Sequence, residues 1–270
     1  MDLASRALRV SLLLLYVAFV LAPVFLMFLG SFGQRWFGTL LPEGFTLEWY
    51  LRLFSEPMYY RALLRSLLVG ALTLVLGLLV CVPAAYAVVV LENRWVRYFY
   101  EFLVILPIAI PPVVLGLGLI QAYNVKGLRL VGSWQLLVLA HVLYTLPFML
   151  KPLVANMEMI SWKVLEEAAR SLGAGLPTTF RRVLLPNLVP GILSGALMTF
   201  TISLGEFQLA VILTSSLSQT FPVVLYQAFY VSTGFACAAT TLLTFACLFA
   251  LVAVMALSRG FSGYGNRSIW

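Results

Sequence analysis

Charge is what this sequence has least of, and its scarcity excludes most soluble proteins. Only 10% of the 270 residues are Asp, Glu, Lys or Arg, whereas 62% are hydrophobic and the mean hydropathy is +1.01. A soluble chain of this length cannot cover its surface with so few charged side chains. The composition therefore predicts a protein that resides in a lipid membrane.

Residues that bind metals or form disulfides are also rare. The 3 cysteines, Cys81, Cys237 and Cys247, lie in apolar runs without CxxC spacing, so we interpret them as packing residues. The single histidine, His141, cannot form a multi-ligand metal site, and we expect it to be structural. Neither GxxxxGKS nor GxxxxGKT occurs, so the chain lacks the loop that cradles nucleotide phosphates. We expect no cofactor, no metal and no catalytic residue.

Long uncharged runs are abundant. A helix needs about 20 apolar residues to cross the hydrocarbon core, and the alternating pattern of a membrane barrel is absent. The sequence therefore predicts an all-α membrane protein with six transmembrane helices, the first a retained anchor and the sixth near Gly234–Leu257. The uncharged runs are Val10–Gln34, Ser66–Leu91, Phe102–Val125, Leu130–Leu150, Asn187–Gly205 and Phe207–Ser258, of which the last completes the fifth span and holds the sixth.

The placement of the 17 Lys and Arg residues predicts the orientation. Most of them fall on one side if the N-terminus is inside, so the positive-inside rule places both termini in the cytoplasm. This bias accounts for the net charge of +7. Arginines scattered over several loops do not form the basic stripe that nucleic acid binding requires, so we expect no nucleic acid partner.

The spans divide the chain into three parts. Residues 1–63 hold the first span and an outer interfacial segment with a short helix near Leu47–Phe54; 64–258 form the core with five spans and an inner loop at 156–187; 259–270 form a cytoplasmic tail.

Two local patterns predict the shape and packing of the spans. Pro107, Pro111 and Pro112 are too close together for a straight helix. Gly191 and Gly195 have the GxxxG spacing of a tight helix contact.

The inner loop has the pattern of a helix–turn–helix. Met159, Trp162, Leu165, Ala169 and Leu172 recur at helical spacing and predict one apolar face. Glycine favours the positive φ of a helix end, so Gly173 and Gly175 end this helix. Pro177 starts a second short helix, which runs to Pro186 and the next span. The remaining faces hold Glu158, Lys163, Glu166, Glu167 and Arg170.

The spacing of residues in this loop resembles that of a known protein family. Glu167-Ala168-Ala169 precedes Gly173 by three residues, and nine more lead to Val183-Leu184-Leu185-Pro186. This resembles the EAA loop of permease subunits in binding-protein-dependent ABC importers, with Val183 where the family has Ile. The resemblance implies a type I importer permease fold in a bacterial inner membrane. It also implies three kinds of partner: two copies of an ATP-binding subunit, a second permease chain (the same or homologous) and a solute-binding protein.

The resemblance further implies that the helix near Ser161–Arg170 docks on the ATP-binding subunit, with Gly173 supplying the turn. It implies a small polar solute of the polyamine or 2-aminoethylphosphonate kind, with iron(III), sulfate or molybdate as alternatives. The residues that it assigns to ATPase coupling are Trp162, Leu165, Glu166, Glu167, Ala168, Ala169, Gly173 and Pro186.

Glu206 is the one acidic residue inside an expected span, near Ser203 and Gln208. A bare carboxylate at membrane depth is costly, so it should face protein or water. Two interpretations stay open: Glu206 holds helices together, or with Ser203 and Gln208 it lines the solute pathway. Ser203-Leu-Gly-Glu-Phe207 surrounds an expected helix break and resembles the corresponding stretch of polyamine, aminoethylphosphonate, iron and molybdate permeases.

Other function classes explain the sequence less well. A proton-coupled secondary carrier needs ionisable residues in the membrane, and only Glu206 and His141 are available. An intramembrane serine hydrolase would use Ser194 and His141, but the spacing around Ser194 is one residue off the GxSG pattern. An amphipathic interfacial linker would not need the fixed register of the inner loop, and a purely structural membrane subunit is the remaining alternative.

Overall fold

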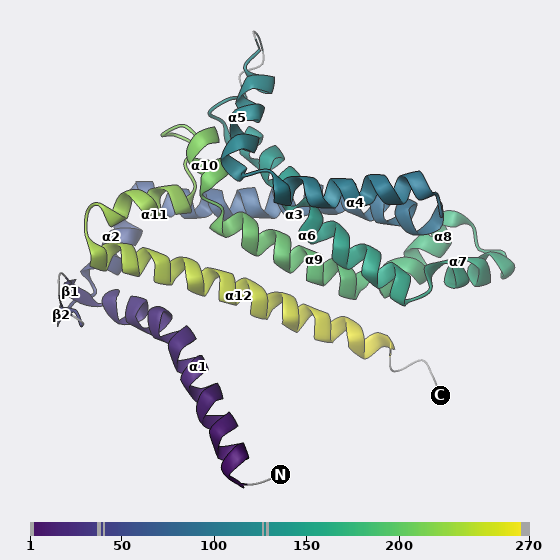
Figure 1. Cartoon of the computed structure of the whole chain (residues 1–270). Helices are drawn as coiled ribbons and strands as arrows, with labels where there is room; N and C mark the ends of the chain where they lie inside the picture. The colour runs from purple at the N-terminus through teal and green to yellow at the C-terminus, as the bar shows by residue number, and fades with distance from the viewer. Residues whose placement is uncertain (1–2, 37–38, 40, 126, 128–129, 266–270) are drawn as a thin grey trace. The chain divides into compact units, whose positions relative to one another are not determined.

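A computed structural model describes residues 3–36, 39, 41–125, 127 and 130–265, and nearly all of its regular structure is helical. Figure 1 shows the elements in chain order. They are α1 Leu3–Gly30, β1 Gly33–Arg35, β2 Glu43–Phe45, α2 Glu48–Ser55, α3 Pro57–Val90, α4 Arg94–Ala109, α5 Pro112–Tyr123, α6 Trp134–Met159, α7 Trp162–Ser171, α8 Leu176–Thr179, the π-helical turn η1 Phe180–Leu184, α9 Leu185–Gly205, α10 Gln208–Leu213, α11 Phe221–Phe229 and α12 Thr233–Gly265.

The chain divides into two units. The first comprises Met1–Arg61 and Val224–Ala246, and the second comprises Ala62–Val223 and Cys247–Trp270. Two segments from opposite ends of the sequence thus build the first unit. The expected three-part division stays a prediction. It groups residues by their position relative to the membrane, whereas these units group residues by their contacts.

In the first unit a small hairpin follows α1. Strands β1 and β2 pair antiparallel, with Gly33 opposite Phe45, and the indole Nε1–H of Trp49 donates to the Gly33 carbonyl at 2.8 Å. Helix α2 confirms the short helix expected near Leu47–Phe54. The hairpin was not expected, because its strands are only 3 residues long and show no alternating pattern.

The six expected spans are confirmed, although one of them is not a single helix. In the described part of the chain, five helical segments are long and apolar enough to cross a membrane, and α4 with α5 is the sixth when the pair, bent by 104°, is taken as one span. The bend lies at Ile110-Pro111, where Ile110 is extended at ψ 123°. Proline disfavours the α conformation in the residue before it, so the expected break in this proline-rich stretch is confirmed.

The core of the second unit is the packing of α6 against α9. A Cβ atom added at Gly191 would lie 2.7 Å from Cβ of Asn156, and one added at Gly195 would lie 3.0 Å from the backbone oxygen of Met149. The two glycines therefore allow close approach, which confirms the GxxxG prediction. Helix α4 also packs on α6, and Figure 1 shows α7 and α8 at one end of α6 and α9.

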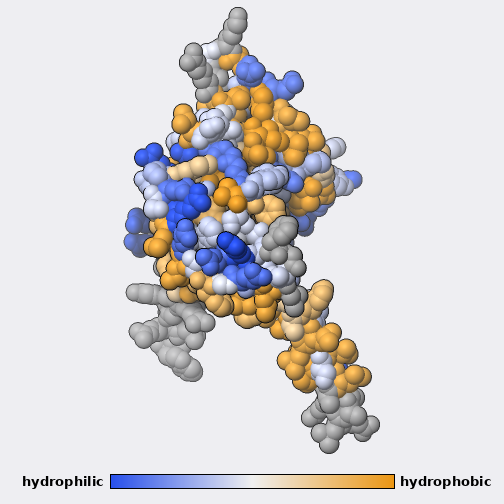
Figure 2. All heavy atoms as spheres, turned by 90° about the vertical axis from the view of Figure 1, so that its left-hand side faces the viewer, coloured by the Kyte–Doolittle hydropathy of each residue, from blue (hydrophilic) through white to orange (hydrophobic). Residues whose placement is uncertain are grey.

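Much of the surface is apolar. On the face drawn in Figure 2, hydrophobic residues cover large areas and the hydrophilic ones gather in patches. In the most apolar 18-residue stretch of α1, no residue is buried. Such a surface is incompatible with water but suits the hydrocarbon core of a bilayer.

Candidate coupling site

Helix α7 has sharply defined ends. It begins after Ser161, a residue in the left-handed conformation at φ +51°, and its last turn leads to Gly173 at φ +80°. The Gly173 N–H donates to the Arg170 carbonyl at 2.8 Å, and the Ala174 N–H donates to the Ala169 carbonyl at 3.0 Å. This pair of bonds is a Schellman motif, and the predicted glycine terminus is confirmed.

The inward face of α7 differs from the expected one. Trp162 and Ala169 are buried as expected, but Met159 is 77% exposed and Leu172 is 88% exposed. Glu166, which was expected on a polar face, is 5% exposed. The expected face was wrong at its ends because Met159 belongs to α6 and Leu172 follows the last turn of α7, so neither shares the helical period.

The buried carboxylate of Glu166 is fully engaged. The hydroxyl of Tyr86 in α3 donates to its two oxygens at 3.1 and 3.2 Å, and the guanidinium of Arg170 donates at 2.6 Å. The indole ring of Trp162 packs edge-on against the Tyr86 ring with centroids 5.8 Å apart. A buried charge is tolerated where it is paired and hydrogen-bonded. Glu166 therefore faces the inside of the second unit.

The outward face of α7 bears small, charged and apolar side chains. Val164, Glu167, Ala168 and Arg170 are exposed, and Lys163 forms an ion pair with Glu92 of the α3–α4 turn. A shallow hollow of about 220 Å³ lies between the end of α3 and α7, lined by Val90, Lys163, Glu166, Glu167 and Arg170. Of the residues assigned to coupling, Glu167, Ala168, Gly173 and Pro186 are exposed, and the first two lie on α7 itself. Leu165 is half-buried, and Trp162, Glu166 and Ala169 are buried.

Beyond Gly173 the chain stays helical into the next span. Helix α8, the π turn η1 and α9 follow one another without a break, so the second short helix does not stop at Pro186. The Leu185 N–H donates five residues back to the Phe180 carbonyl. Pro186 lies in the first turn of α9, where its missing N–H is tolerated beside the wider π turn. The loop is thus continuous with α9.

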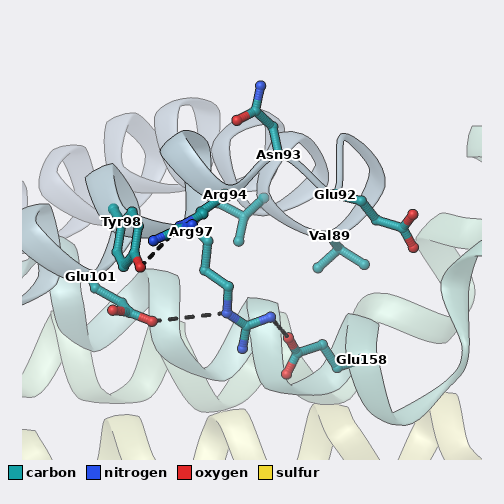
Figure 3. Close-up of a pocket in the computed structure, with 9 residues that line it drawn as sticks. Val89, Glu92, Asn93, Arg94, Arg97, Tyr98, Glu101 and Glu158 are labelled. Atoms are coloured by element: carbon teal, nitrogen blue, oxygen red, sulfur yellow. Dashed lines mark hydrogen bonds and ion pairs between the residues drawn. The ribbon is translucent and has the colours of Figure 1, made fainter.

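A second, larger cavity of about 490 Å³ lies beside this site, and Figure 3 shows residues that line it. The Arg97 guanidinium lies 3.5 Å from the Glu158 carboxylate at the end of α6 and 3.9 Å from Glu101. Arg94 donates from Nε to the Tyr98 hydroxyl at 3.1 Å. The contacts of Arg97 with Glu101 and of Arg94 with Tyr98 lie within α4, and the ion pair of Arg97 with Glu158 joins α4 to the end of α6 that leads into α7.

Glu206 sits at the expected break. Helix α9 ends at Gly205, Glu206 is extended, and α10 begins at Gln208. The buried carboxylate of Glu206 accepts the backbone N–H groups of Leu209 and Ala210 at 2.8 and 3.1 Å. It therefore satisfies donors at the start of α10 that the break would otherwise leave open.

The sequence-predicted neighbours of Glu206 separate in space. Ser203 is buried with it, whereas Gln208 is exposed. His141 of α6 completes the cluster: its Nδ1 lies 2.7 Å from Ser203 Oγ, and its Nε2 lies 3.5 Å from Glu206 Oε2. This confirms that His141 packs inside the bundle. The proximity of His141 to Glu206 could not be predicted from their spacing along the sequence, because the two residues belong to different spans.

Relatives of known class resemble most of the chain. Residues 74–263 match the family described as "Binding-protein-dependent transport system inner membrane component". A spermidine/putrescine transport system permease protein, PotC of Haemophilus influenzae, is 30% identical over 199 residues, 74% of this chain and 76% of the relative. A putative 2-aminoethylphosphonate transport system permease protein, PhnV of Salmonella typhi, is 30% identical over 216 residues, 79% of this chain and 80% of the relative.

Solved structures show the same fold. A bacterial ABC transporter involved in the import of the acidic polysaccharide alginate has a chain that matches with a TM-score of 0.73 at 18% identity, covering 97% of both chains. The alginate transporter in complex with a periplasmic protein bound to alginate pentasaccharide gives 0.75, covering 96% of this chain and 94% of that chain. The chain belongs to the family of binding-protein-dependent transport system inner membrane components, as a multi-pass ABC importer permease that is not itself an enzyme.

Proposed function

We propose that this chain couples to two copies of a separate ATP-binding subunit through α7 and admits a small polar solute delivered by a solute-binding protein. The observation that carries the proposal is that α7 has one buried face and one exposed face. One face is anchored inside the unit by Trp162 and Glu166, and the other exposes Glu167 and Ala168. A helix held firmly on one face can transmit a force applied to the other.

The continuity of the chain beyond α7 supports a mechanical role. From Leu176 to Gly205 the backbone forms one helical path that includes η1. A displacement of α7 by a closing ATP-binding pair would therefore reach α9 through stiff helix. Transitions of this kind move packed helices as bodies between two states, here inward-open and outward-open.

The proposal includes a second permease chain, the same or homologous, and places the α7 loop and both termini in the cytoplasm. The Lys and Arg distribution supports this orientation. A proton-coupled carrier would need a relay of ionisable side chains across the membrane. Among the described residues, the buried Asp, Glu, Lys, Arg and His side chains are Glu166 of α7 and the pair of His141 and Glu206, which do not make such a relay. Glu206 satisfies two backbone donors, which supports a structural role for it rather than solute contact.

For the solute we propose a small molecule with a protonated amine. Spermidine, putrescine and 2-aminoethylphosphonate, which appear in the names of the relatives, share that group. Iron(III), sulfate and molybdate have no such group and are the alternatives. This proposal rests on the names of the relatives. It does not rest on a described pocket of this chain.

Uptake in the native host tests the solute. A strain without this gene, and the same strain with the gene restored, are given radiolabelled spermidine, putrescine or 2-aminoethylphosphonate at low concentration. We expect the restored gene to recover uptake of one of them, competed by its unlabelled form and not by sulfate or molybdate. Recovery of uptake of iron(III), sulfate or molybdate alone would replace the proposed solute class.

A further inference from the structure

Helix α7 is linked to the spans in two ways. Through the chain itself it is joined to α6, by Ile160-Ser161, and to α9, by way of α8 and η1. Its link to α3, which lies far away in the sequence, consists of side-chain contacts: Tyr86 with Glu166, the Tyr86 ring with Trp162, and Glu92 with Lys163. These side chains join α7 directly to α3, which also packs on α6 through Cys81 and Ala85.

Tyr86 is the residue on which most of this link depends. Its hydroxyl donates to both oxygens of Glu166, and its ring packs against Trp162, which is 1% exposed. Its partners Trp162 and Glu166 are four residues apart, so they lie on the same inward side of α7. One aromatic side chain thus holds α7 at two successive turns.

The contact is chemically specific. Glu166 is buried, and its other described partner is the partly exposed Arg170. If the Tyr86 hydroxyl were removed, part of a buried carboxylate would lose its donor, which costs more than the net worth of an ordinary hydrogen bond. The carboxylate would then turn toward Arg170 and the hollow, and α7 would keep the ring contact of Trp162 with Tyr86 and the ion pair of Lys163 with Glu92.

The exposed docking residues lie beside this contact. Glu167 and Ala168 directly follow Glu166, so the same turn of α7 bears the outward surface and the inward anchor. Farther along, Arg97 holds the first turns of α4 to Glu158 of α6. Two surface ion pairs, Arg97 with Glu158 and Glu92 with Lys163, thus link the α3–α4 corner to the coupling region.

We propose that Tyr86 is a positioning residue that makes α3 follow α7, through its hydrogen bond to the buried carboxylate of Glu166. The proposal rests on the proposed function, because it concerns how movement of the docked helix reaches the spans. It extends that function by adding a side-chain route, through α3, to the covalent routes through α6 and α9.

The distance between α3 and α7 tests the proposal. The tagged chain is purified from its own host with the subunits that accompany it, after Cys81, Cys237 and Cys247 are replaced by alanine. Spin labels are placed at Val80→Cys on α3 and Ser171→Cys on α7, both exposed positions. We expect the same label distance without nucleotide and with ATP and vanadate, because the two helices move together.

In Tyr86→Phe we expect the distance to change by about 1–2 Å between the two nucleotide states, the size of helix shifts at moving interfaces. Glu166→Gln should show the same change to a smaller extent, since its amide oxygen still accepts from Tyr86. The double variant should not exceed Tyr86→Phe, because both changes act on the same contact. Tyr60→Phe, on the same helix and without a described hydroxyl partner, is the matched control.

The outcomes separate this proposal from the one on which it rests. If no ATP-binding subunit accompanies the chain, the proposed function fails. If that subunit is present but Tyr86→Phe keeps the distance constant in both states, the Tyr86 link is overturned while the proposed function stands. A distance that already changes with nucleotide before Tyr86 is replaced also overturns the link.

Discussion

At the scale of single residues, Gly173 and Gly175 show how one backbone angle defines the coupling helix. A Cβ atom added at either position would meet no close neighbour. Gly173, however, lies at φ +80°, whereas Gly175 lies at φ −72°. An L-residue in the left-handed region costs about 1–2 kcal/mol, so only the first glycine is required by the backbone.

We therefore predict that Gly173→Ala loosens the end of α7 and Gly175→Ala does not. Hydrogen exchange in the purified complex measures this at the Ala174 amide, which closes the Schellman motif. Its protection should fall about tenfold in Gly173→Ala, in proportion to the strain. Equal protection in the two variants would mean that the φ of Gly173 does not hold this terminus.

Residues of the site were predictable where the signal is local. The Gly173 terminus follows from residue type, and the break near Glu206 follows from the glycine and acid within an apolar run. The burial of Glu166 could not be predicted, because its donor Tyr86 lies 80 positions away along the chain. The contact of His141 with Ser203 spans 62 positions and was hidden for the same reason.

At the scale of elements, the bend between α4 and α5 shows that the position of a proline matters more than its presence. Pro107 lies inside α4, and Pro83 lies inside α3, and neither helix breaks there. At Pro111 the preceding Ile110 is extended, and Pro112 then begins α5 as its first residue. Two adjacent prolines remove two consecutive backbone donors, so a continuous helix cannot form across them.

Replacing both prolines should straighten this span. We predict that Pro111→Ala with Pro112→Ala lets α4 run into α5, whereas Pro83→Ala leaves the same distance unchanged. Spin labels at Phe99→Cys and Leu117→Cys, exposed positions on α4 and α5, report the bend. Their separation should increase as the 104° bend opens. An unchanged separation would show that packing against α6 and α10 sets the bend.

At the scale of the whole molecule, the number of spans was predictable because hydropathy is summed over about 20 residues and tolerates local errors. The two packing units were not, since residues 224–246 join residues 1–61 across most of the sequence. The hairpin of β1 and β2 likewise depends on contacts such as Trp49 with Gly33 rather than on strand pattern. The spans follow from short stretches of sequence, whereas the packing units depend on contacts between residues far apart in the sequence.

The central claim is that the exposed face of α7 docks on a separate ATP-binding subunit. The most direct measurement places a photo-activated cross-linking residue at Ala168 in the native host and identifies the captured protein by mass spectrometry. A matched control carries the same residue at Leu79, an exposed position within α3. We predict that Ala168 captures a subunit with a GxxxxGKS or GxxxxGKT loop and that Leu79 does not. Capture of that subunit at Leu79 alone, or at neither position, would contradict the claim.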